Sequence, residues 1–368
     1  SFGGWINAVI PVLIVPYYSV IGGWVIKYLV EYFRGNAKLL AEDGYFTDFI
    51  SNGVSTELCF VAFCAFTLII IFAGVQNGIE RVSKIMMPIL IVLSVIIAVY
   101  SVTRPGALAG VKYFLVPNVK NFSWMTVVSA MGQMFYSLSI AMGILITFGS
   151  YMKKDTAIED STRNVEIFDT GIAIMAGLMI IPAVFAFSGG DPDTLQAGPS
   201  LMFITIPKVF QNMGFGTVIG IVFFLLVLFA AVTSSIALTE SAVSTFEDEL
   251  GWGRKKATVL VGVIMLALGS LSSLGYGPLA GIKIIGMQFL DLFDFLTNSV
   301  MMPIAALLTS LFVSRVVGID KIEEEIIHGE SAFRRKKVFV VMIKYLCPVF
   351  AIIILLSSVA NALGWIKM

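Results

Sequence analysis

Residues 216–232 read GTVIGIVFFLLVLFAAV, and no charged side chain interrupts the chain from Gly216 to Thr239. A membrane-spanning helix needs about 20 mostly apolar residues, so this stretch is long enough to cross a bilayer. In lipid every backbone N–H and C=O group must be paired within the protein, which leaves only helices and closed barrels. Because a barrel strand is shorter and alternates apolar with polar residues, the stretch predicts an all-α membrane protein.

Eight more apolar runs surround this one. Of the 368 residues, 58% are hydrophobic and only 13% are charged, whereas soluble chains carry about 25% charged residues. The nine runs lie near residues 5–33, 58–74, 84–102, 124–151, 166–187, 215–246, 257–275, 283–313 and 338–362. We therefore predict a polytopic helical bundle with about nine spans. The net charge is zero, which gives no reason to expect a nucleic-acid partner.

The Lys and Arg residues in the connections predict the orientation. One set of alternate connections holds 14 of the 24. They are Arg81, Lys84, Lys153, Lys154, Arg163, Arg254, Lys255, Lys256, Arg315, Lys321, Arg334, Arg335, Lys336 and Lys337. Since cytoplasmic loops are enriched in Lys and Arg, this set is expected to face the cytoplasm. The first run then travels outward, and the C-terminus lies outside the cell or in the periplasm.

One connection, 188–214, is long and rich in Gly and Pro. Its apolar stretch Leu201–Phe210 is too short to span a bilayer. Two interpretations fit the pattern equally well: a loop that packs back onto the outer face as a lid, and a segment that lies in the membrane interface.

Four carboxylates fall within or beside the apolar runs: Asp169, Glu240, Asp291 and Asp294. An ionisable group inside a span costs about 2.5–3.5 kcal/mol on insertion scales, which makes each a candidate functional residue. Asp291 and Asp294 are three residues apart and therefore share one helix face. The plainer alternative is a carboxylate at the interface or in a packing hydrogen bond.

Small and hydroxylic residues interrupt the fourth run between Gly132 and Gly143, where the chain reads GQMFYSLSIAMG. Discontinuous helices near mid-membrane hold ion and substrate sites in transporters. Such stretches are also common helix-packing faces, which the pattern alone favours. Thr233-Ser234-Ser235 has the same ambiguity, because hydroxyls often bond back to their own helix. Hard oxygen ligands of this kind suit an alkali cation.

At these residues the chain resembles the neurotransmitter:sodium symporters, especially prokaryotic amino-acid transporters with the LeuT-type fold. The resemblance runs nearly end to end. Five blocks in the same order carry it: Pro16–Trp24, like the third family helix; Gly78–Pro88, like the loop into the fifth; Gly132–Tyr151, like the broken sixth; Phe229–Leu250, like the eighth; and Phe289–Phe295, like the start of the tenth.

The resemblance implies that the nine runs correspond to family helices three to eleven. The chain begins with Ser1, and we expect it to be a fragment that lacks the first two family helices. The expected domain organisation is a single transporter domain over 1–368. Within it, 1–122 is the remainder of the first inverted repeat, 123–313 the second, and 314–368 a cytoplasmic loop and the final helix.

Sodium sites follow from the resemblance. Ser137 and Asp169 match part of one site, and Ala230, Thr233 and Ser234 match one side of a second. Many relatives carry Asn at the Asp169 position, so the carboxylate implies a stronger, charged ligand that could also couple to protonation. Chloride-dependent relatives carry Ser at the position of Ala173, so no chloride requirement is expected. The expected cofactors are sodium ions, with no organic cofactor.

Substrate and gate residues follow in the same way. The expected substrate-binding residues are Ile14, Tyr18, Tyr136, Ser137, Ser139, Met142, Ser234 and Leu238. Tyr18 matches the tyrosine that holds a substrate carboxylate, and Tyr136 takes the position of an aromatic lid. Gln133 and Asp294 match the outer gate, and Tyr151 and Asp248 the inner gate. Each gate's Arg partner would precede Ser1.

The function implied is sodium-coupled symport of a neutral, hydrophobic amino acid by alternating access in the cell membrane. Expected partners are the amino acid and the lipid bilayer, with a homodimer left open. Two other classes remain. One is a proton-coupled or sodium-independent amino-acid transporter of related fold, in which Asp169 and Glu240 carry protons. The other is a non-transporting binding or scaffold protein, because a chain without the first two helices would hold only half of each ion site. No enzyme activity is expected.

Overall fold

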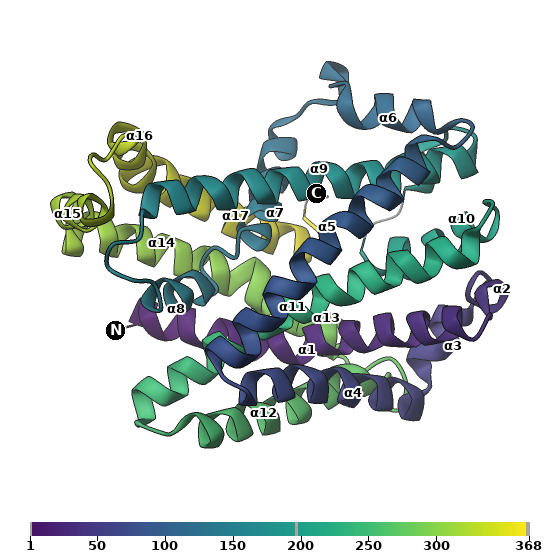
Figure 1. Ribbon diagram of the computed structural model, residues 1–368, viewed down its shortest axis with the longest axis horizontal. Helices are drawn as coiled ribbons and strands as arrows, with labels where there is room; N and C mark the ends of the chain where they lie inside the picture. Colours follow the sequence, from purple (N-terminus) through teal and green to yellow (C-terminus); the bar gives the residue numbers. More distant parts are fainter. Residues whose placement is uncertain (1, 196–197, 366–368) are drawn as a thin grey trace.

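The computed structural model describes residues 2–195 and 198–365 and is built of helices (Figure 1). Eight helices in this part of the chain are long and apolar enough to cross a bilayer. They are α1 (Phe2–Phe33), α4 (Gly53–Phe72), α5 with a preceding π-helical turn (Val75–Val102), α9 (Ile158–Ser188), α11 (Gly216–Leu250), α12 (Arg254–Leu274), the α13–α14 span (Phe289–Val317) and the α16–α17 span (Lys336–Ala362). The predicted all-α polytopic bundle is confirmed.

The fourth apolar run is the one that forms no continuous span. It divides into α7 (Trp124–Ser137) and α8 (Ile144–Ser150), with six non-helical residues between them. A reciprocal pair of hydrogen bonds between Ser123 and Thr126 caps the start of α7. The interruption that the resemblance implied is therefore confirmed.

Helix α1 lies in the middle of the bundle and packs against α4, α11 and α12. Small residues allow these helices to approach closely. A Cβ atom on Gly220 of α11 would lie 2.2 Å from the ring of Tyr32 on α1, and one on Gly269 of α12 would lie 2.2 Å from the ring of Phe60 on α4. The first contact joins α11 to α1, and the second joins α12 to α4, two helices that also pack against α1. Helix α1 carries Ile14, Tyr17 and Tyr18.

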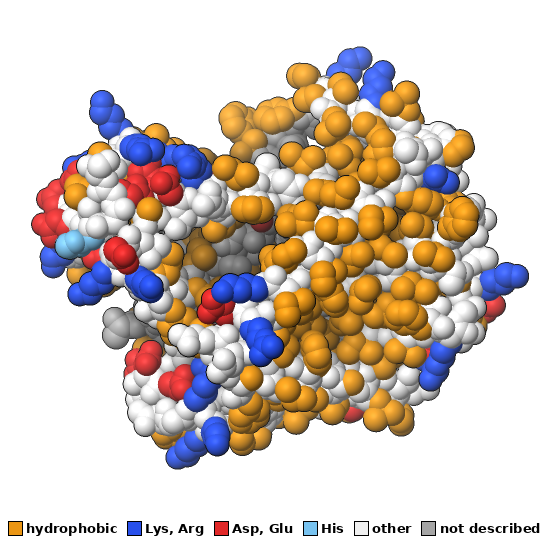
Figure 2. Space-filling view, in the orientation of Figure 1, with side chains coloured by type: hydrophobic (Ala, Val, Ile, Leu, Met, Phe, Trp, Pro, Cys, Tyr) orange, Lys and Arg blue, Asp and Glu red, His pale blue; other side chains and the backbone are white. Residues whose placement is uncertain are grey.

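The outer surface of the bundle is apolar. Figure 2 shows hydrophobic side chains spread over most of one face. On α5, for example, Val92 and Val99 are each 57% exposed. Such a surface suits a lipid environment and would be an aggregation liability in water.

The connections add short helices: α2 (Ala37–Leu40), α3 (Tyr45–Ser51), α6 (Ala107–Leu115), α10 (Ile206–Gln211) and α15 (Ile319–Gly329). His328 lies in the last turn of α15. The segment Leu201–Gln211 packs back onto the bundle. Phe203 and Phe210 are buried, and the Tyr28 hydroxyl donates to the Phe203 carbonyl at 2.7 Å. Of the two interpretations of this loop, packing onto the bundle is confirmed.

Candidate functional site

The break between α7 and α8 exposes backbone groups inside the bundle. Ser139, Ala141 and Gly143 have positive φ angles of 54°, 60° and 74°. Among the hydrogen bonds between described residues, none ends on a carbonyl oxygen of 138–142. Backbone carbonyls inside a protein are normally paired. Because the carbonyl oxygens of 138–142 lack such partners, they are available to a cation or a ligand.

Gly143 fixes where α8 begins. A Cβ there would lie 2.9 Å from the Asn7 carbonyl oxygen of α1 and 3.0 Å from the Ser241 hydroxyl of α11. The Thr147 hydroxyl one turn later donates to Ser241 at 3.2 Å. The absence of a side chain at Gly143 therefore lets α8 sit against both helices.

Ala141 is strained, because its Cβ crowds the backbone at a φ of 60°. We expect Ala141→Gly to raise the free energy of unfolding by about 0.5–1 kcal/mol, since glycine adopts this conformation freely. A matched control is Ala130→Gly within α7, which should lower it by about 1 kcal/mol. Thermal unfolding in detergent measures both. Equal destabilisation by the two changes would contradict the positive φ at Ala141.

Ser137 and Asp169 meet beside the break. The Ser137 hydroxyl at the end of α7 donates to Asp169 Oδ1 on α9 at 2.5 Å. Asp169 is half-buried and has no cationic partner among the ion pairs of the described residues. A carboxylate and a hydroxyl next to unpaired carbonyls form a set of hard oxygen ligands, which fits an alkali cation.

The second group of predicted residues lies on α11 and α1. The Thr233 hydroxyl donates to the carbonyls of Phe229 and Ala230, each at 3.0 Å, so it bonds back to its own helix. Ser234 is exposed, and its side chain interacts with the Tyr18 hydroxyl of α1. The structure thus brings Tyr18 and Ser234 together.

Apolar side chains from three segments accompany this pair. Ile14 on α1, Leu238 on α11 and Met142 in the break are all buried. Ser139, in contrast, lines a separate apolar cavity of about 270 Å³ together with Ala141 and Asn7.

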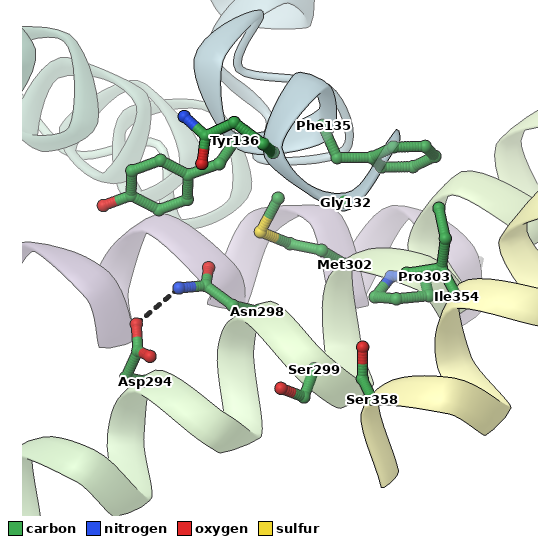
Figure 3. Close-up of a pocket in the computed structure, with 11 residues that line it drawn as sticks. Gly132, Phe135, Tyr136, Asp294, Asn298, Ser299, Met302, Pro303, Ile354 and Ser358 are labelled. Atoms are coloured by element: carbon green, nitrogen blue, oxygen red, sulfur yellow. Dashed lines mark hydrogen bonds between the residues drawn. The ribbon is translucent and has the colours of Figure 1, made fainter. Parts of the chain in front are cut away.

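A cavity of about 340 Å³ lies between α7, the α13–α14 span and the α16–α17 span, which all line it. Figure 3 shows Tyr136 on α7 facing Asp294 and Asn298, with Ser299 and Ser358 farther along the wall. Gln133 also lines this cavity, so both residues predicted for the outer gate line the same cavity. Tyr136 is close enough to interact electrostatically with both Tyr18 and Asp294, which links the cavity to the Tyr18–Ser234 pair.

Two residues that bind the Asp294 carboxylate, Tyr17 and Asn298, were missed from the sequence. The Tyr17 hydroxyl donates to Asp294 Oδ1 at 3.2 Å and lies 3.1 Å from the Thr297 hydroxyl. Asn298 Nδ2 donates to the same carboxylate oxygen at 2.5 Å. Tyr17 is adjacent to Tyr18, but in a run as apolar as 5–33 nothing distinguished it from a packing aromatic.

Asp291, the other acid on that helix face, points to the loop after α12. Tyr276 donates to Asp291 Oδ1 at 3.3 Å. Burial and the nearby Asp291 carboxylate raise the pKa of Tyr276, so its hydroxyl keeps the proton that it donates. Asp291 therefore has a hydrogen-bond partner of its own, separate from those of Asp294.

A polar network closes the opposite end of the site. Glu240 on α11 is fully buried, and Arg254 at the start of α12 binds both of its oxygens, at 3.0 and 2.5 Å. The Tyr151 hydroxyl donates to Glu240 Oε1 at 2.7 Å, and Arg254 Nε donates to the Ile71 carbonyl at 3.0 Å. Asp248 lies exposed near the end of α11, and no hydrogen bond in the described chain joins it to Tyr151. The network thus ties α4, α8, α11 and α12 together.

Comparison with known proteins identifies the family. The model of the sodium:neurotransmitter symporter family matches residues 30–365. The chain belongs to this family. The sodium-dependent transporter YhdH of Bacillus subtilis is 34% identical over 97% of this chain and 79% of its own length. A sodium-dependent transporter of Haemophilus influenzae is 31% identical over 94% of this chain and 76% of its own length.

A solved structure agrees with the sequence comparison. The crystal structure of MhsT in complex with L-phenylalanine matches this symporter with a TM-score of 0.84 and 33% identity, over 97% of this chain and 81% of that one. The fold is therefore the LeuT-type fold of the family. The symporter is a multi-pass membrane protein and a sodium-coupled transporter, not an enzyme.

Proposed function

We propose that this symporter takes up a neutral, hydrophobic amino acid together with sodium by alternating access. MhsT, the solved relative, binds L-phenylalanine, which is a substrate of this class. The observation that carries the proposal is the broken α7–α8 segment, which brings unpaired carbonyls to the Ser137–Asp169 pair. A half-helix with exposed backbone is a suitable place for both an ion and a zwitterionic substrate.

The residues divide by role. Ser137 and Asp169 hold one sodium ion, and Ala230, Thr233 and Ser234 contribute to a second. Tyr18 binds the substrate carboxylate, and Ile14, Met142 and Leu238 form an apolar wall for the side chain. Tyr136 closes the site from one side, with Ser137, Ser139 and Ser234 supplying polar contacts.

Two gates at opposite ends serve alternating access. Gln133 and Asp294 form the outer gate beside the 340 Å³ cavity. Tyr151 and Asp248 form the inner gate; Tyr151 donates to Glu240, which Arg254 also binds. Coupling requires that sodium and substrate favour the same conformation, so each must bind one state more tightly than the other.

The topology proposal follows the basic residues. The connections richest in Lys and Arg face the cytoplasm, which places the C-terminus outside or in the periplasm. Residues 1–122 belong to the first inverted repeat, 123–313 to the second, and 314–368 to a cytoplasmic loop and the last helix. Ala173 gives no hydroxyl to chloride, so transport is chloride-independent.

A proton-coupled variant of this function would need a free carboxylate to carry the proton. Glu240 is a poor carrier, because Arg254 binds both of its oxygens. Asp169 has no such partner, so it is the carboxylate that a proton mechanism would use.

The substrate proposal is tested with the full-length gene product in proteoliposomes. We expect a sodium gradient to drive uptake of labelled phenylalanine, and unlabelled leucine to compete with it. Glutamate and lysine should compete at least about tenfold less well, because the apolar wall offers no partner for a charged side chain. Potassium in place of sodium is the control. Uptake driven by a pH gradient without sodium would contradict the proposal, as would preferred uptake of a charged amino acid.

A further inference from the structure

Two glutamates from distant parts of the chain, Glu159 and Glu330, each accept backbone hydrogen bonds from the segment that holds the other. Glu330 follows α15, and its Oε1 accepts from the backbone N–H groups of Glu159 and Asp160, at 2.6 and 3.2 Å. Those groups belong to the first turn of α9, where backbone donors lack partners within the helix. A side chain some 170 residues away thus caps α9, which has no cap hydrogen bond from its own N-cap residue Ala157.

Glu159 in turn binds the backbone of the segment that follows Glu330. Its two oxygens accept from the backbone N–H groups of Arg334 and Arg335, at 2.9 and 3.0 Å, just before α16 begins. The Glu159 side chain is only 11% exposed. We call Glu159, Glu330 and the backbone of Arg334 and Arg335 the glutamate clamp.

Two further contacts fasten the clamp. Arg335 Nη1 donates to both oxygens of Glu166, two turns farther along α9, at 3.2 and 2.9 Å. A Cβ on Gly329 would lie 2.3 Å from the Thr156 carbonyl oxygen, so the two backbones touch. Figure 2 shows the acidic and basic side chains of this region gathered in one lobe, in contrast with the apolar bundle.

The clamp acts on the helix that carries Asp169. Ten residues separate Glu159 from Asp169, which is about 15 Å along an α-helix. This segment contains neither Gly nor Pro, so a shift or rotation at its start reaches Asp169 undiminished. The Asp169 contact with Ser137 depends on that position, because the two side chains come from different helices.

We propose that the glutamate clamp positions α9 so that Asp169 faces Ser137 and the sodium ion, an inference that rests on the proposed sodium site. Glu330 is a positioning residue and does not touch the ion. The clamp also joins α9 to the segment between the last two spans. Movement of that segment therefore changes the sodium affinity.

The variants Glu330→Ala and Glu330→Gln test this role. Alanine removes the cap, whereas glutamine keeps an oxygen that can accept from the two N–H groups. Glu324→Ala, an exposed glutamate on α15, is the matched control. We expect Glu330→Ala to raise the sodium concentration for half-maximal phenylalanine uptake about three- to tenfold, the effect of losing a helix cap. The maximal rate at saturating sodium should change less than twofold, and Glu330→Gln should restore most of the affinity.

A second readout does not depend on transport. With the three native cysteines replaced by serine, the pair Ser137→Cys and Asp169→Cys should form a disulfide rapidly when the clamp is intact. Adding Glu330→Ala should slow this reaction, and adding Glu324→Ala should not. Equal cross-linking rates in all three backgrounds would overturn the clamp proposal, even if transport proved independent of sodium. If Glu330→Ala leaves the sodium concentration for half-maximal uptake unchanged, while the unmodified protein shows normal sodium-driven uptake, the clamp proposal is also overturned. The proposed function would then remain intact.

Discussion

Replacing Arg254 by methionine is expected to lower the free energy of unfolding by about 3–5 kcal/mol, because it leaves a buried carboxylate without its cation. Glu240 is 0% exposed and takes two hydrogen bonds from Arg254, at 3.0 and 2.5 Å. Within residues 2–195 and 198–365, the Tyr151 hydroxyl is then the one donor left to the Glu240 carboxylate, at 2.7 Å. The Ile71 carbonyl also loses its hydrogen bond from Arg254 Nε and keeps the one from the Gly74 N–H, at 3.0 Å.

The double variant Arg254→Met with Glu240→Met separates the lost charge from the lost packing. Replacing both members of a buried ion pair by apolar residues of similar size is often neutral. We therefore expect the double variant to recover most of the stability, measured by thermal or denaturant unfolding in detergent. A single variant as stable as the unmodified protein, or a double variant as unstable as the single one, would contradict the account of this network.

The spans were predictable from the sequence because their physical cause is local. Each apolar run is long enough to cross a bilayer, and lipid allows such a run only one regular structure. The interruption between α7 and α8 was not predictable in this way. It depends on positive φ at Ser139 and Ala141, residue types that give no signal of a left-handed backbone. The small and hydroxylic residues of 132–143 left a discontinuous helix as one of two interpretations, and only the family resemblance favoured it over a packing face.

The polar networks were less predictable than the helices. Glu240 and Asp169 drew attention as carboxylates in apolar runs, but neither Arg254 nor Ser137 could be assigned as a partner from pattern alone. No sequence pattern singled out Glu159 or Glu330, because a cap supplied from so far along the chain leaves no local motif. Pairings of this kind come from tertiary packing, which single-sequence patterns do not record.

The second large effect is expected at Asp169. The change Asp169→Ala removes the carboxylate that we propose binds sodium beside the break, together with the acceptor for the Ser137 hydroxyl. A hydrogen bond or ligand contact to a charged group contributes about 1.5–3 kcal/mol, so sodium affinity should fall about a hundredfold and uptake at physiological sodium should fall to background. The variant should still fold, because Asp169 is half-buried and its neighbours on α9 are largely exposed.

Asp169→Asn is the matched control. An amide keeps an oxygen of the same reach without its charge, so we expect sodium-dependent uptake to persist with weaker sodium affinity. Asp193→Ala, in the exposed loop after α9, should leave uptake unchanged.

The sodium dependence of phenylalanine uptake, measured for the unmodified symporter and its Asp169→Ala variant in matched proteoliposomes, tests the central claim most directly. A saturable rise in uptake with sodium for the unmodified protein, and none for the variant, is the predicted result. Equal sodium-driven uptake by both proteins, with the variant inserted at the same level, would show that the cation does not bind at the break between α7 and α8.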